Sequence, residues 1–215
     1  MPRTLSQKQF HSICNELASK DADLKCIIET HGYPQMGSRP NTYESLVHLI
    51  LEQQVSLASA MAALNKLHEK IGEITPDNLL TLTDDELKSC YFSRQKMTYA
   101  RSVAEAIQNK TLDLKGMHKL SDEEVRDQLT ALKGIGNWTA DIYLMSVLHR
   151  SDVFPIGDLA AVNALKQIKN LPKDTPQEEL LEIAATWKPH RTAATRILWH
   201  YYLYSKAKVK VKAGN

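Results

Sequence analysis

Two closely spaced glycines, followed directly by a predicted helix, form a pattern in this sequence that suggests anion binding. Gly134 and Gly136 bracket one apolar residue, Ile135, and a helical pattern begins directly afterwards at Asn137. A helix N-terminus carries unpaired backbone N–H groups and the positive end of the helix dipole, so it can bind an anion. Glycines lack a Cβ atom, so a phosphate can approach their backbone closely. The pattern indicates a helix-hairpin-helix that grips a nucleic-acid backbone; the alternative is an ordinary αα-hairpin with a glycine cap.

An aspartate stands one helix and one connector beyond this turn. The segment 137–150 is expected to form the second hairpin helix, and the extended segment 152–157 leads from it to Asp158 at the start of another helix. A carboxylate in that place could face a cleft beside a bound backbone. Aspartate is also a preferred N-cap, and the apolar residues after Asp158 suit that structural role. The sequence leaves both roles open, and one side chain can serve both.

The segments that must position these residues carry apolar side chains at helical spacing throughout. Ser121, followed by Glu124 three residues later, is a capping-box pattern at the start of the first hairpin helix. No segment reads as a convincing strand, so the sequence predicts an all-α fold of roughly ten to twelve short helices. The basic tail 206–212 is expected to fray. The expected helices cover 4–20, 21–30, 42–52, 56–71, short segments from Pro76 and Thr83, 93–109, 121–131, 137–150, 158–169, a segment from Thr175, and 190–206.

The composition is that of an ordinary globular protein. The 215 residues are 43% hydrophobic and 24% charged, which suits one or two small domains with a real core. A net charge of +2 does not by itself indicate nucleic-acid binding. Three cysteines lie far apart without a CxxC pair, so we expect no zinc or iron–sulfur site and a reduced intracellular compartment. No apolar run approaches the ~18 residues of a membrane span, and no apolar signal segment is visible.

Several further segments stand in a characteristic order around the glycine turn. The run 51–56 and the run 93–96 precede it, and the runs 132–140, 152–158 and 187–191 follow one another, with Ala194 and Trp199 beyond. Together these segments resemble the helix-hairpin-helix DNA glycosylases, and within them the alkylbase branch of the DNA-3-methyladenine glycosylase II type. The resemblance covers residues 41–204. The ordered set of motifs is highly specific, whereas the glycine turn alone would be a weak signal.

The resemblance implies two α-helical lobes with the active site in a cleft between them. One lobe is expected over 41–150, with the helix-hairpin-helix at 121–150. The other lobe combines 1–40 with 151–215 and carries the catalytic aspartate. The implied partner is double-stranded DNA with an alkylated base or an abasic site, bound by a monomer in the nucleus.

In this family the hairpin holds a DNA phosphate. A monovalent cation, Na⁺ or K⁺, often sits on hairpin carbonyls, which would here belong to Thr130, Leu132 and Ile135. No metal ligand is expected from a side chain. No other cofactor is implied.

The family's essential aspartate falls on Asp158. Breaking an N-glycosidic bond develops positive charge on the sugar, which a carboxylate stabilises while it orients or deprotonates water. A base alkylated on a ring nitrogen is already cationic, so the enzyme must flip and hold it more than protonate it. Aromatic faces suit such a base through stacking and cation–π contact, although a core position is the alternative for each aromatic side chain. The base-pocket candidates are Trp138, Trp199, Ser56, Tyr43 and Phe154.

Further DNA contacts are implied outside the turn. In this family a wedge side chain enters the DNA stack and fills the gap left by a flipped base, and it comes from the loop before the Ser93 helix. Phe92, or Arg94 beside it, would be that wedge here. Gln53 or Gln54 would approach the opposite strand or the gap. Ser93, Arg94 and Lys96 can hold phosphates; a solvated helix start is the alternative. The expected DNA-binding set is Gly134, Ile135, Gly136, Asn137, Thr139, Gln53, Gln54, Phe92, Ser93, Arg94 and Lys96.

Four residues distinguish this chain within the family. Members that cleave the DNA strand carry a Schiff-base lysine where Trp138 stands, so no β-lyase activity is expected. Some yeast members have histidine where this chain has Ser56, and relatives often have glycine where Ala160 and Ala161 follow Asp158. The alternative function is therefore a weakly active or inactive homologue that binds abasic sites or distorted DNA. A generic helix-hairpin-helix binding module would leave Asp158 and Trp138 without a role.

Overall fold

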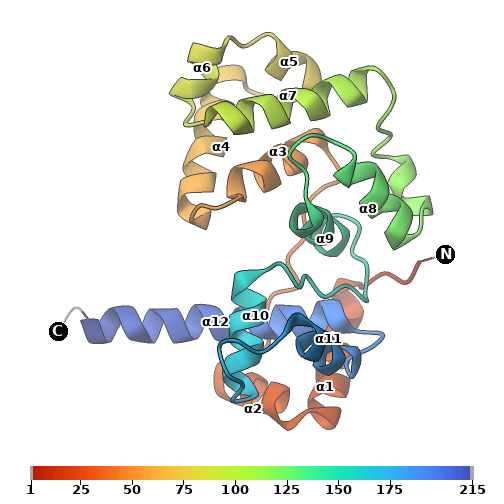
Figure 1. Cartoon of the computed structure of the whole chain (residues 1–215), viewed down its shortest axis with the longest axis vertical. Helices are drawn as coiled ribbons and strands as arrows, with labels where there is room; N and C mark the ends of the chain where they lie inside the picture. The colour runs from red at the N-terminus through yellow and green to blue at the C-terminus, as the bar shows by residue number, and fades with distance from the viewer. Residues whose placement is uncertain (1, 214–215) are drawn as a thin grey trace. The chain divides into compact units, whose positions relative to one another are not determined.

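The chain folds into helices joined by short loops (Figure 1). The computed structural model describes residues 2–213, and their side chains as far as Lys206. Within those residues there is no strand, only an isolated bridge between Thr4 and Arg150. The predicted all-α class is therefore confirmed. The helices are α1 (Gln7–Lys20), α2 (Ala22–His31), α3 (Tyr43–Glu52), α4 (Leu57–Ile71), α5 (Pro76–Leu80), α6 (Asp84–Ser89), α7 (Arg94–Gln108), the 3-10 helix η1 (Gly116–Lys119), α8 (Asp122–Thr130), α9 (Asn137–Ser146), α10 (Leu159–Ile168), α11 (Gln177–Ala185) and α12 (Arg191–Ala213).

The chain divides into two compact units, which are described separately below. Unit 1 comprises Arg39–Leu148 together with the start of the chain, and unit 2 comprises Arg3–Ser38 with the segment from His149 onward. The predicted lobe boundary after residue 40 lies two residues from the boundary after Ser38. No helix in the described part of the chain is long and apolar enough to cross a membrane.

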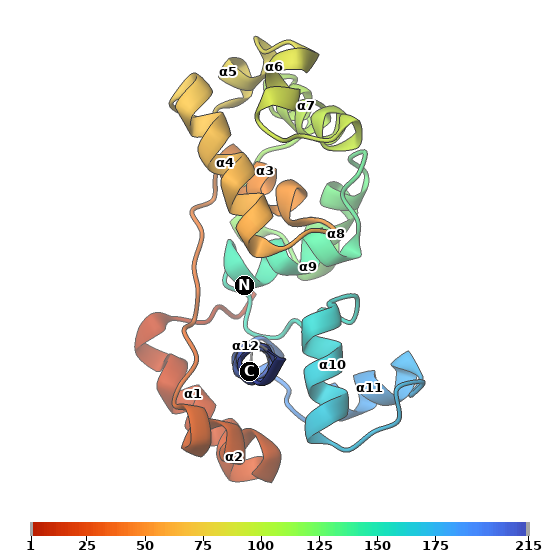
Figure 2. The ribbon, with the colours of Figure 1, turned by 90° about the vertical axis from the view of Figure 1, so that its left-hand side faces the viewer.

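Unit 1 is built around α3. This helix packs against α4, α7 and α9, and α9 also packs against α8 (Figure 2). Apolar residues on nearly every side of α3, including Leu46, Leu49 and Ile50, are fully buried because the helix has neighbours on several faces. The helices α5 and α6 cover α7. Unit 1 thus places the end of α3 and the start of α9 on one packed scaffold.

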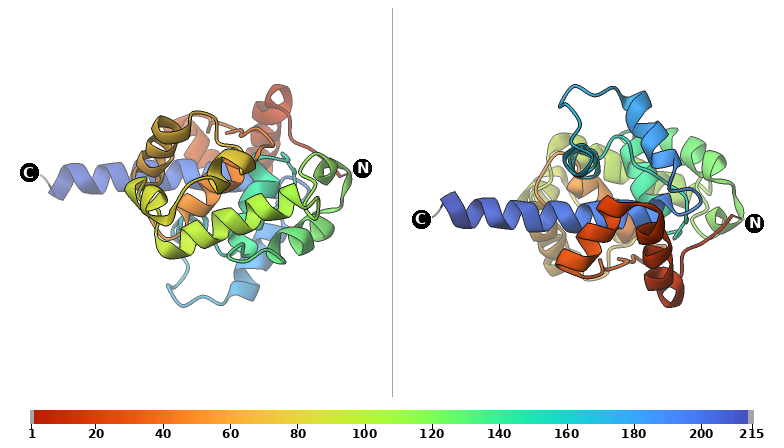
Figure 3. Two further views of the ribbon diagram at one scale, coloured as in Figure 1. Left: turned by 90° about the horizontal axis from the view of Figure 1, so that it is seen from above. Right: turned by 90° about the horizontal axis from the view of Figure 1, so that it is seen from below.

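Unit 2 is built around α12. The helices α1, α2 and α10 pack against it, and α11 joins through α10 (Figure 3). The last turns of α12 extend past the other helices of this unit (Figure 3). The buried core of unit 2 includes Phe10, Cys14, Leu17, Leu24, Leu165, Leu180, Trp187, Ala194, Ile197 and Leu198.

Capping residues fix most of the predicted helix starts. The Ser121 side chain accepts the Glu124 N–H, and the Glu124 side chain accepts the Ser121 N–H in return. Ser56 caps α4 and Thr83 caps α6, as the sequence predicts. Each such cap contributes about 1 kcal/mol, because it satisfies a backbone N–H group that the helix leaves open.

Two predicted helix ends are wrong, and one helix of the structure was not predicted. The helix expected over 137–150 ends at Ser146, because the chain then turns and His149 adopts a left-handed φ of 53°. The last helix does not end at 206: its backbone continues to Ala213, so the tail is helical where fraying was expected, and its lysine side chains beyond Lys206 lie outside the described residues. The short helix η1 was not predicted.

A buried charge network holds the first helices of unit 2 to its last ones. Asp21 caps α2, accepts the Trp187 indole N–H at 2.8 Å, and accepts the Lys169 ammonium at 2.9 Å. Burial raises the pKa of the Asp21 carboxyl, but the hydrogen bonds from Lys169 and Trp187 outweigh burial, and the net pKa lies below its ordinary value. Trp187 itself is almost fully buried in the core of unit 2.

This network predicts a specific loss of stability in acid. A carboxyl whose pKa is depressed in the folded protein stabilises it above the unfolded pKa of about 4, and this contribution disappears as the pH falls through the folded pKa. Asp21→Asn should keep the cap but lower the free energy of unfolding at pH 7 by about 1–3 kcal/mol. Urea unfolding between pH 3 and pH 7 measures both effects. A variant whose stability follows the wild-type pH dependence unchanged would contradict this account.

Candidate nucleic-acid interface and carboxylate site

The glycine turn in unit 1 has one position that requires glycine and one that does not. Gly134 has a left-handed φ of 84°, and a Cβ there would lie 2.1 Å from the Tyr99 ring. Gly136 is the N-cap of α9 with an extended backbone, and a Cβ there would meet open space. The turn therefore packs against the Tyr99 ring at Gly134, and its backbone is exposed to solvent at Gly136. The exposed N-terminus of α9 retains the anion-binding chemistry expected from the sequence.

The side chain of Gln53 ties the end of α3 to this turn. Its amide nitrogen donates to the Gly134 carbonyl at 3.0 Å and lies 3.1 Å from the Thr139 hydroxyl. The sequence predicted that Gln53 would approach the DNA gap or opposite strand, but the amide instead holds the hairpin from within unit 1. Thr139 is 1% exposed and Ile135 is 4% exposed, so neither residue presents its side chain to a phosphate.

The two hairpin helices are also clamped by an ion pair. Arg126 on α8 donates to Asp141 on α9 at 2.8 Å, and the Asp141 side chain is buried. Sequence reasoning assigned no role to this pair, although both residues stand close to the turn. Its contribution is to fix the angle at which α9 presents its N-terminus.

The turn contains backbone carbonyl oxygens of the kind that suits a monovalent cation. The Leu132 carbonyl accepts the Ile135 N–H at 3.1 Å and keeps a second lone pair, while the Gly134 carbonyl accepts from Gln53. No group of three His, Cys, Asp or Glu residues in the described chain is arranged for a metal ion. These oxygens fit a Na⁺ or K⁺ ion better than a divalent metal, because none of them carries a charge.

In unit 2, Asp158 is held at the start of α10. One carboxylate oxygen, Oδ1, accepts the Ala161 N–H at 2.8 Å and the Trp199 indole N–H at 2.8 Å. The predicted N-cap role is therefore confirmed, and the same side chain is oriented by a second donor from α12. A carboxylate with a fixed orientation is what a positively charged transition state requires.

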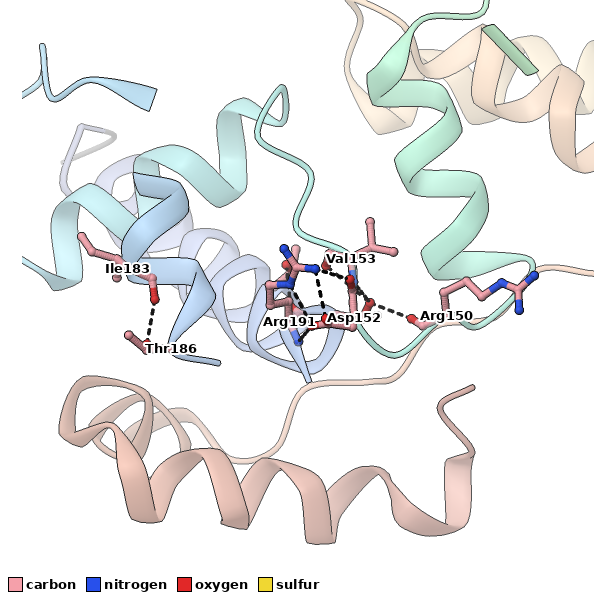
Figure 4. Close-up of polar contacts among 8 residues, drawn as sticks. Arg150, Asp152, Val153, Ile183, Thr186 and Arg191 are labelled. Carbon is pink, nitrogen blue, oxygen red and sulfur yellow. Dashed lines mark hydrogen bonds and ion pairs between the residues drawn. The ribbon is translucent and has the colours of Figure 1, made fainter. Parts of the chain in front are cut away.

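The connector that leads to Asp158 is fastened to the first turn of α12 (Figure 4). The Arg191 guanidinium donates to both carboxylate oxygens of Asp152, at 2.8 and 3.0 Å, and to the Asp152 carbonyl at 2.8 Å. The Thr192 hydroxyl donates to the Arg150 carbonyl at 2.7 Å. A bidentate arginine pair fixes direction as well as distance, so the connector enters α10 along a defined path.

Trp199 contacts the carboxylate with its edge and an arginine with its face. The Arg196 guanidinium carbon lies 4.9 Å from the Trp199 ring centroid. The indole N–H points to Asp158, as described above. Trp199 is half-buried, and its indole N–H contacts Asp158 directly.

Comparison with known proteins identifies the family. Residues 47–189 match the HhH-GPD superfamily, described as base excision DNA repair proteins. The chain belongs to the HhH-GPD superfamily. It is 32% identical over 161 residues to DNA-3-methyladenine glycosylase 1 of Schizosaccharomyces pombe, covering 73% of this chain and 71% of that protein. It is 30% identical over 162 residues to the alkylbase DNA glycosidase-like protein mag2 of the same organism, covering 73% and 76%.

Solved structures agree with this assignment. The S. pombe 3-methyladenine DNA glycosylase Mag1 in complex with abasic DNA is similar with a TM-score of 0.78 and 28% identity, over 87% of this chain and 95% of that one. A DNA-3-methyladenine glycosidase from Bacillus halodurans is similar with a TM-score of 0.75 and 28% identity, over 94% and 92%. The predicted membership in the helix-hairpin-helix glycosylases is confirmed.

Two of the HhH-GPD base-pocket candidates are core residues here. The Tyr43 ring is buried and its hydroxyl donates to the Ala100 carbonyl at 2.9 Å; burial raises the pKa of this phenol above its ordinary value. Phe154 is buried with its ring centroid 6.2 Å from that of Trp187. Both predictions are corrected, because each ring is already enclosed by its own unit. Ser56 is exposed, and its hydroxyl caps α4 by accepting the Ser59 N–H at 3.1 Å.

The predicted DNA contacts before α7 also need correction. Phe92 is 3% exposed and packs in the core, so it does not present a wedge; its neighbour Tyr91 is 63% exposed with a left-handed φ of 65°. The Lys96 ammonium donates to the Leu51 carbonyl at 2.7 Å. It therefore binds the C-terminal end of α3 and not a phosphate. Burial lowers the pKa of Lys96. Sequence reasoning assigned no role to Tyr91, although its aromatic ring stands next to Phe92 in the sequence.

The remaining expected contacts are accessible. Arg94 is exposed in the first turn of α7, and Ser93 caps that helix. Gln54 is exposed and has a left-handed φ of 57°. Asn137 is exposed, and Trp138 is half-buried in the first turn of α9. These residues stay predicted DNA or base contacts.

Gln53 supports a testable prediction about the hairpin. Gln53→Ala removes the contacts to Gly134 and Thr139, which loosens the turn, and should weaken DNA binding roughly fivefold, equivalent to about 1 kcal/mol. Fluorescence anisotropy with a labelled abasic-site duplex measures the dissociation constant. Gln128→Ala, which removes an exposed amide on α8 and leaves those contacts in place, is the matched control. Equal affinity of Gln53→Ala and wild type would show that the amide does not support the interface.

Proposed function

We propose that this protein is a monofunctional DNA glycosylase that releases alkylated purines, of the 3-methyladenine and 7-methylguanine type, by hydrolysing the N-glycosidic bond. The observation that carries the proposal is Asp158, a carboxylate oriented by Ala161 and Trp199 in a chain of this superfamily. The names of the yeast relatives, DNA-3-methyladenine glycosylase 1 and an alkylbase DNA glycosidase-like protein, support the substrate class.

The chemistry follows from the charges involved. When the N-glycosidic bond breaks, electrons leave with the base and the sugar becomes an oxocarbenium ion. The Asp158 carboxylate stabilises this cation and orients or deprotonates the water that attacks the sugar. The alkylated base leaves as a neutral purine, because its ring nitrogen already carried the positive charge. In this proposal Trp138 holds the flipped base by stacking.

The products follow from the residue at position 138. An amine at this position would form a Schiff base with the sugar and lead to strand cleavage, and an indole cannot. The products in this proposal are a free purine and an intact strand with an abasic site. The protein acts as a monomer on double-stranded DNA.

The proposed grip on DNA uses backbone groups and a few exposed side chains. The N–H groups at Gly136, Asn137 and the first turn of α9 bind a phosphate, supported by a Na⁺ or K⁺ ion on the turn carbonyls. Exposed Tyr91 replaces Phe92 as the candidate for the wedge that fills the gap left by a flipped base, because its side chain faces solvent at a left-handed turn. Gln54, which is also exposed at a left-handed turn, is the candidate to approach the opposite strand or the gap. Replacement of K⁺ by tetramethylammonium at constant ionic strength tests the cation; unchanged DNA affinity would remove it from the proposal.

A base-release assay tests the proposed activity. Methylated DNA is incubated with excess protein, and free 3-methyladenine and 7-methylguanine are measured by chromatography. Release of both bases in a single turnover is expected. No release above the protein-free control would reject the glycosylase function.

Ser56 supports a second candidate function, a weakly active or inactive binder of abasic sites. Its hydroxyl is engaged in capping α4, so this position supplies no acid or base to the chemistry. A binder would hold an abasic-site duplex more tightly than an intact one while releasing no base. Equal affinity for both duplexes would count against this candidate.

We also propose a nuclear location, as expected for a repair protein with yeast relatives of this size. Microscopy of a fluorescent fusion in the source cell tests it. Exclusion of the fusion from the nucleus would overturn this assignment without affecting the proposed activity.

A further inference from the structure

We propose that Arg196 is a positioning residue of the carboxylate site: its guanidinium, seated against the Gly37 backbone, fixes the Trp199 indole so that the indole N–H stays on Asp158. This inference rests on the proposed function for its catalytic consequence, but its structural part stands on contacts within unit 2. The residues come from three separate parts of the chain, namely the loop before α3, the start of α10, and α12.

The first step is the contact between Trp199 and Asp158. A hydrogen bond of 2.8 Å from the indole N–H restricts the carboxylate only if the indole ring is itself held in place. Asp158 Oδ1 also accepts the Ala161 N–H, which defines the carboxylate plane from the other side. The orientation of the ring of Trp199 therefore determines whether both donors converge on one oxygen.

The second step is the contact between Arg196 and Trp199. The two residues stand three apart on α12, so their side chains lie on the same face of the helix. The guanidinium carbon is 4.9 Å from the ring centroid, within the range of a cation–π contact. A planar guanidinium covers one face of the indole and resists its rotation. That face is consequently closed to a flipped base, and the indole acts on Asp158 with its edge.

The third step is the seat of the guanidinium. Arg196 Nη2 lies 3.5 Å from the Gly37 carbonyl, and a Cβ on Gly37 would lie 2.8 Å from Nη1. Gly37 has a left-handed φ of 66°. A side chain at residue 37 would push the guanidinium off its seat. The sequence contained Gly37 and Arg196 without any signal that they meet, since 159 residues separate them.

Two variants test the proposal without touching Asp158 or Trp199. Arg196→Ala removes the cation, and Gly37→Ala displaces it while leaving Arg196 in the chain. Both should lower the single-turnover rate of base release roughly 10-fold to 100-fold, because small misplacements of a reacting group have effects of this size. The dissociation constant for an abasic-site duplex should stay within about twofold, since DNA binding uses other residues. Arg196→Lys, which keeps a cation over the ring, should recover part of the rate.

The matched control is a second cation–π pair on the same helix. The Lys206 ammonium lies 4.7 Å from the Tyr202 ring centroid, whereas Asp158 Oδ1 accepts from Ala161 and Trp199. Lys206→Ala should leave the rate of base release unchanged. An equal loss of rate in Lys206→Ala and Arg196→Ala would show that general stability of α12 is responsible, and would overturn the proposal.

A second readout separates this inference from the proposed function. Hydrogen exchange of the Trp199 indole N–H, followed by nuclear magnetic resonance, should become roughly 10-fold faster in Arg196→Ala and in Gly37→Ala. Unchanged exchange in both variants would overturn the positioning role even if the wild type releases bases. Faster exchange together with a wild type that releases no base would reject the proposed function and retain the positioning role. Faster exchange with an unchanged rate of release in an active enzyme would overturn the catalytic part.

Discussion

Asp158→Asn should abolish base release while leaving the fold and DNA binding nearly intact. Asparagine has the shape of aspartate and is an equally good N-cap, so α10 keeps its start and the carbonyl oxygen can still accept from Ala161 and Trp199. The variant lacks the negative charge that opposes the oxocarbenium ion. An interaction that acts only in the transition state changes the rate and not the ground-state affinity. We expect a loss of roughly 10³-fold in the single-turnover rate.

The experiment compares release rate, DNA affinity and stability in the same preparations. Asp174→Asn, an exposed carboxylate of the same unit, is the matched control for loss of one negative charge on a DNA-binding protein. It should release bases at the wild-type rate. If Asp158→Asn keeps more than about a tenth of the wild-type rate, the carboxylate is not the group that stabilises the sugar cation.

Gly134→Ala should be the most destabilising single change in the hairpin. The substitution places a methyl group against the Tyr99 ring and holds an L-residue in the left-handed region, where φ is 84°. The backbone term costs about 1–2 kcal/mol and the overpacking about 1–3 kcal/mol, so the free energy of unfolding should fall by about 2–5 kcal/mol. DNA binding should weaken with it, because the turn must shift to relieve the contact.

Chemical denaturation separates the two causes of that loss. Gly136→Ala is the matched control, since Gly136 has an extended backbone and open space around it. It should change stability by less than about 1 kcal/mol. In a Tyr99→Ala background, Gly134→Ala should cost only the backbone term of about 1–2 kcal/mol. A Gly134→Ala variant as stable as Gly136→Ala would contradict the described packing of the turn.

Local chemistry made much of the hairpin and of Asp158 predictable. Ser121 with Glu124, and Asp158 before an apolar run, are patterns whose hydrogen bonds close within three residues, so the sequence contains both partners side by side. The left-handed glycine in the turn belongs to the same class of local signal. The family resemblance added the chemical role of the aspartate, which no local pattern can supply.

Contacts between distant residues were not predictable in the same way. Gln53 meets Gly134 across 81 positions, and Lys96 meets Leu51 across 45, so neither amide nor ammonium could be assigned to a partner from spacing. Which of two neighbouring rings becomes buried depends on the backbone: the left-handed turn at Tyr91 sends that ring outward and Phe92 inward. The same limit applies to Tyr43 and Phe154, whose enclosing contacts come from residues distant in the sequence.

The last helix shows a third kind of limit. Its final segment has lysines in alternation with small and apolar residues, which matches no amphipathic helix. Lysine and alanine nevertheless have good helix propensity, and the turns before this segment are already formed by packing in unit 2. The backbone therefore continues as a helix to Ala213 without an apolar stripe to announce it.

The central claim is that this chain removes an alkylated purine by hydrolysis, and the most direct measurement uses a duplex with a single 7-methylguanine. Protein in excess is added, the reaction is stopped, and each sample is divided into one half heated with alkali and one half left untreated. The account predicts free 7-methylguanine, strand breakage only after alkali, and no release by Asp158→Asn. Breakage without alkali, or no release of the base by the wild-type protein, would contradict it.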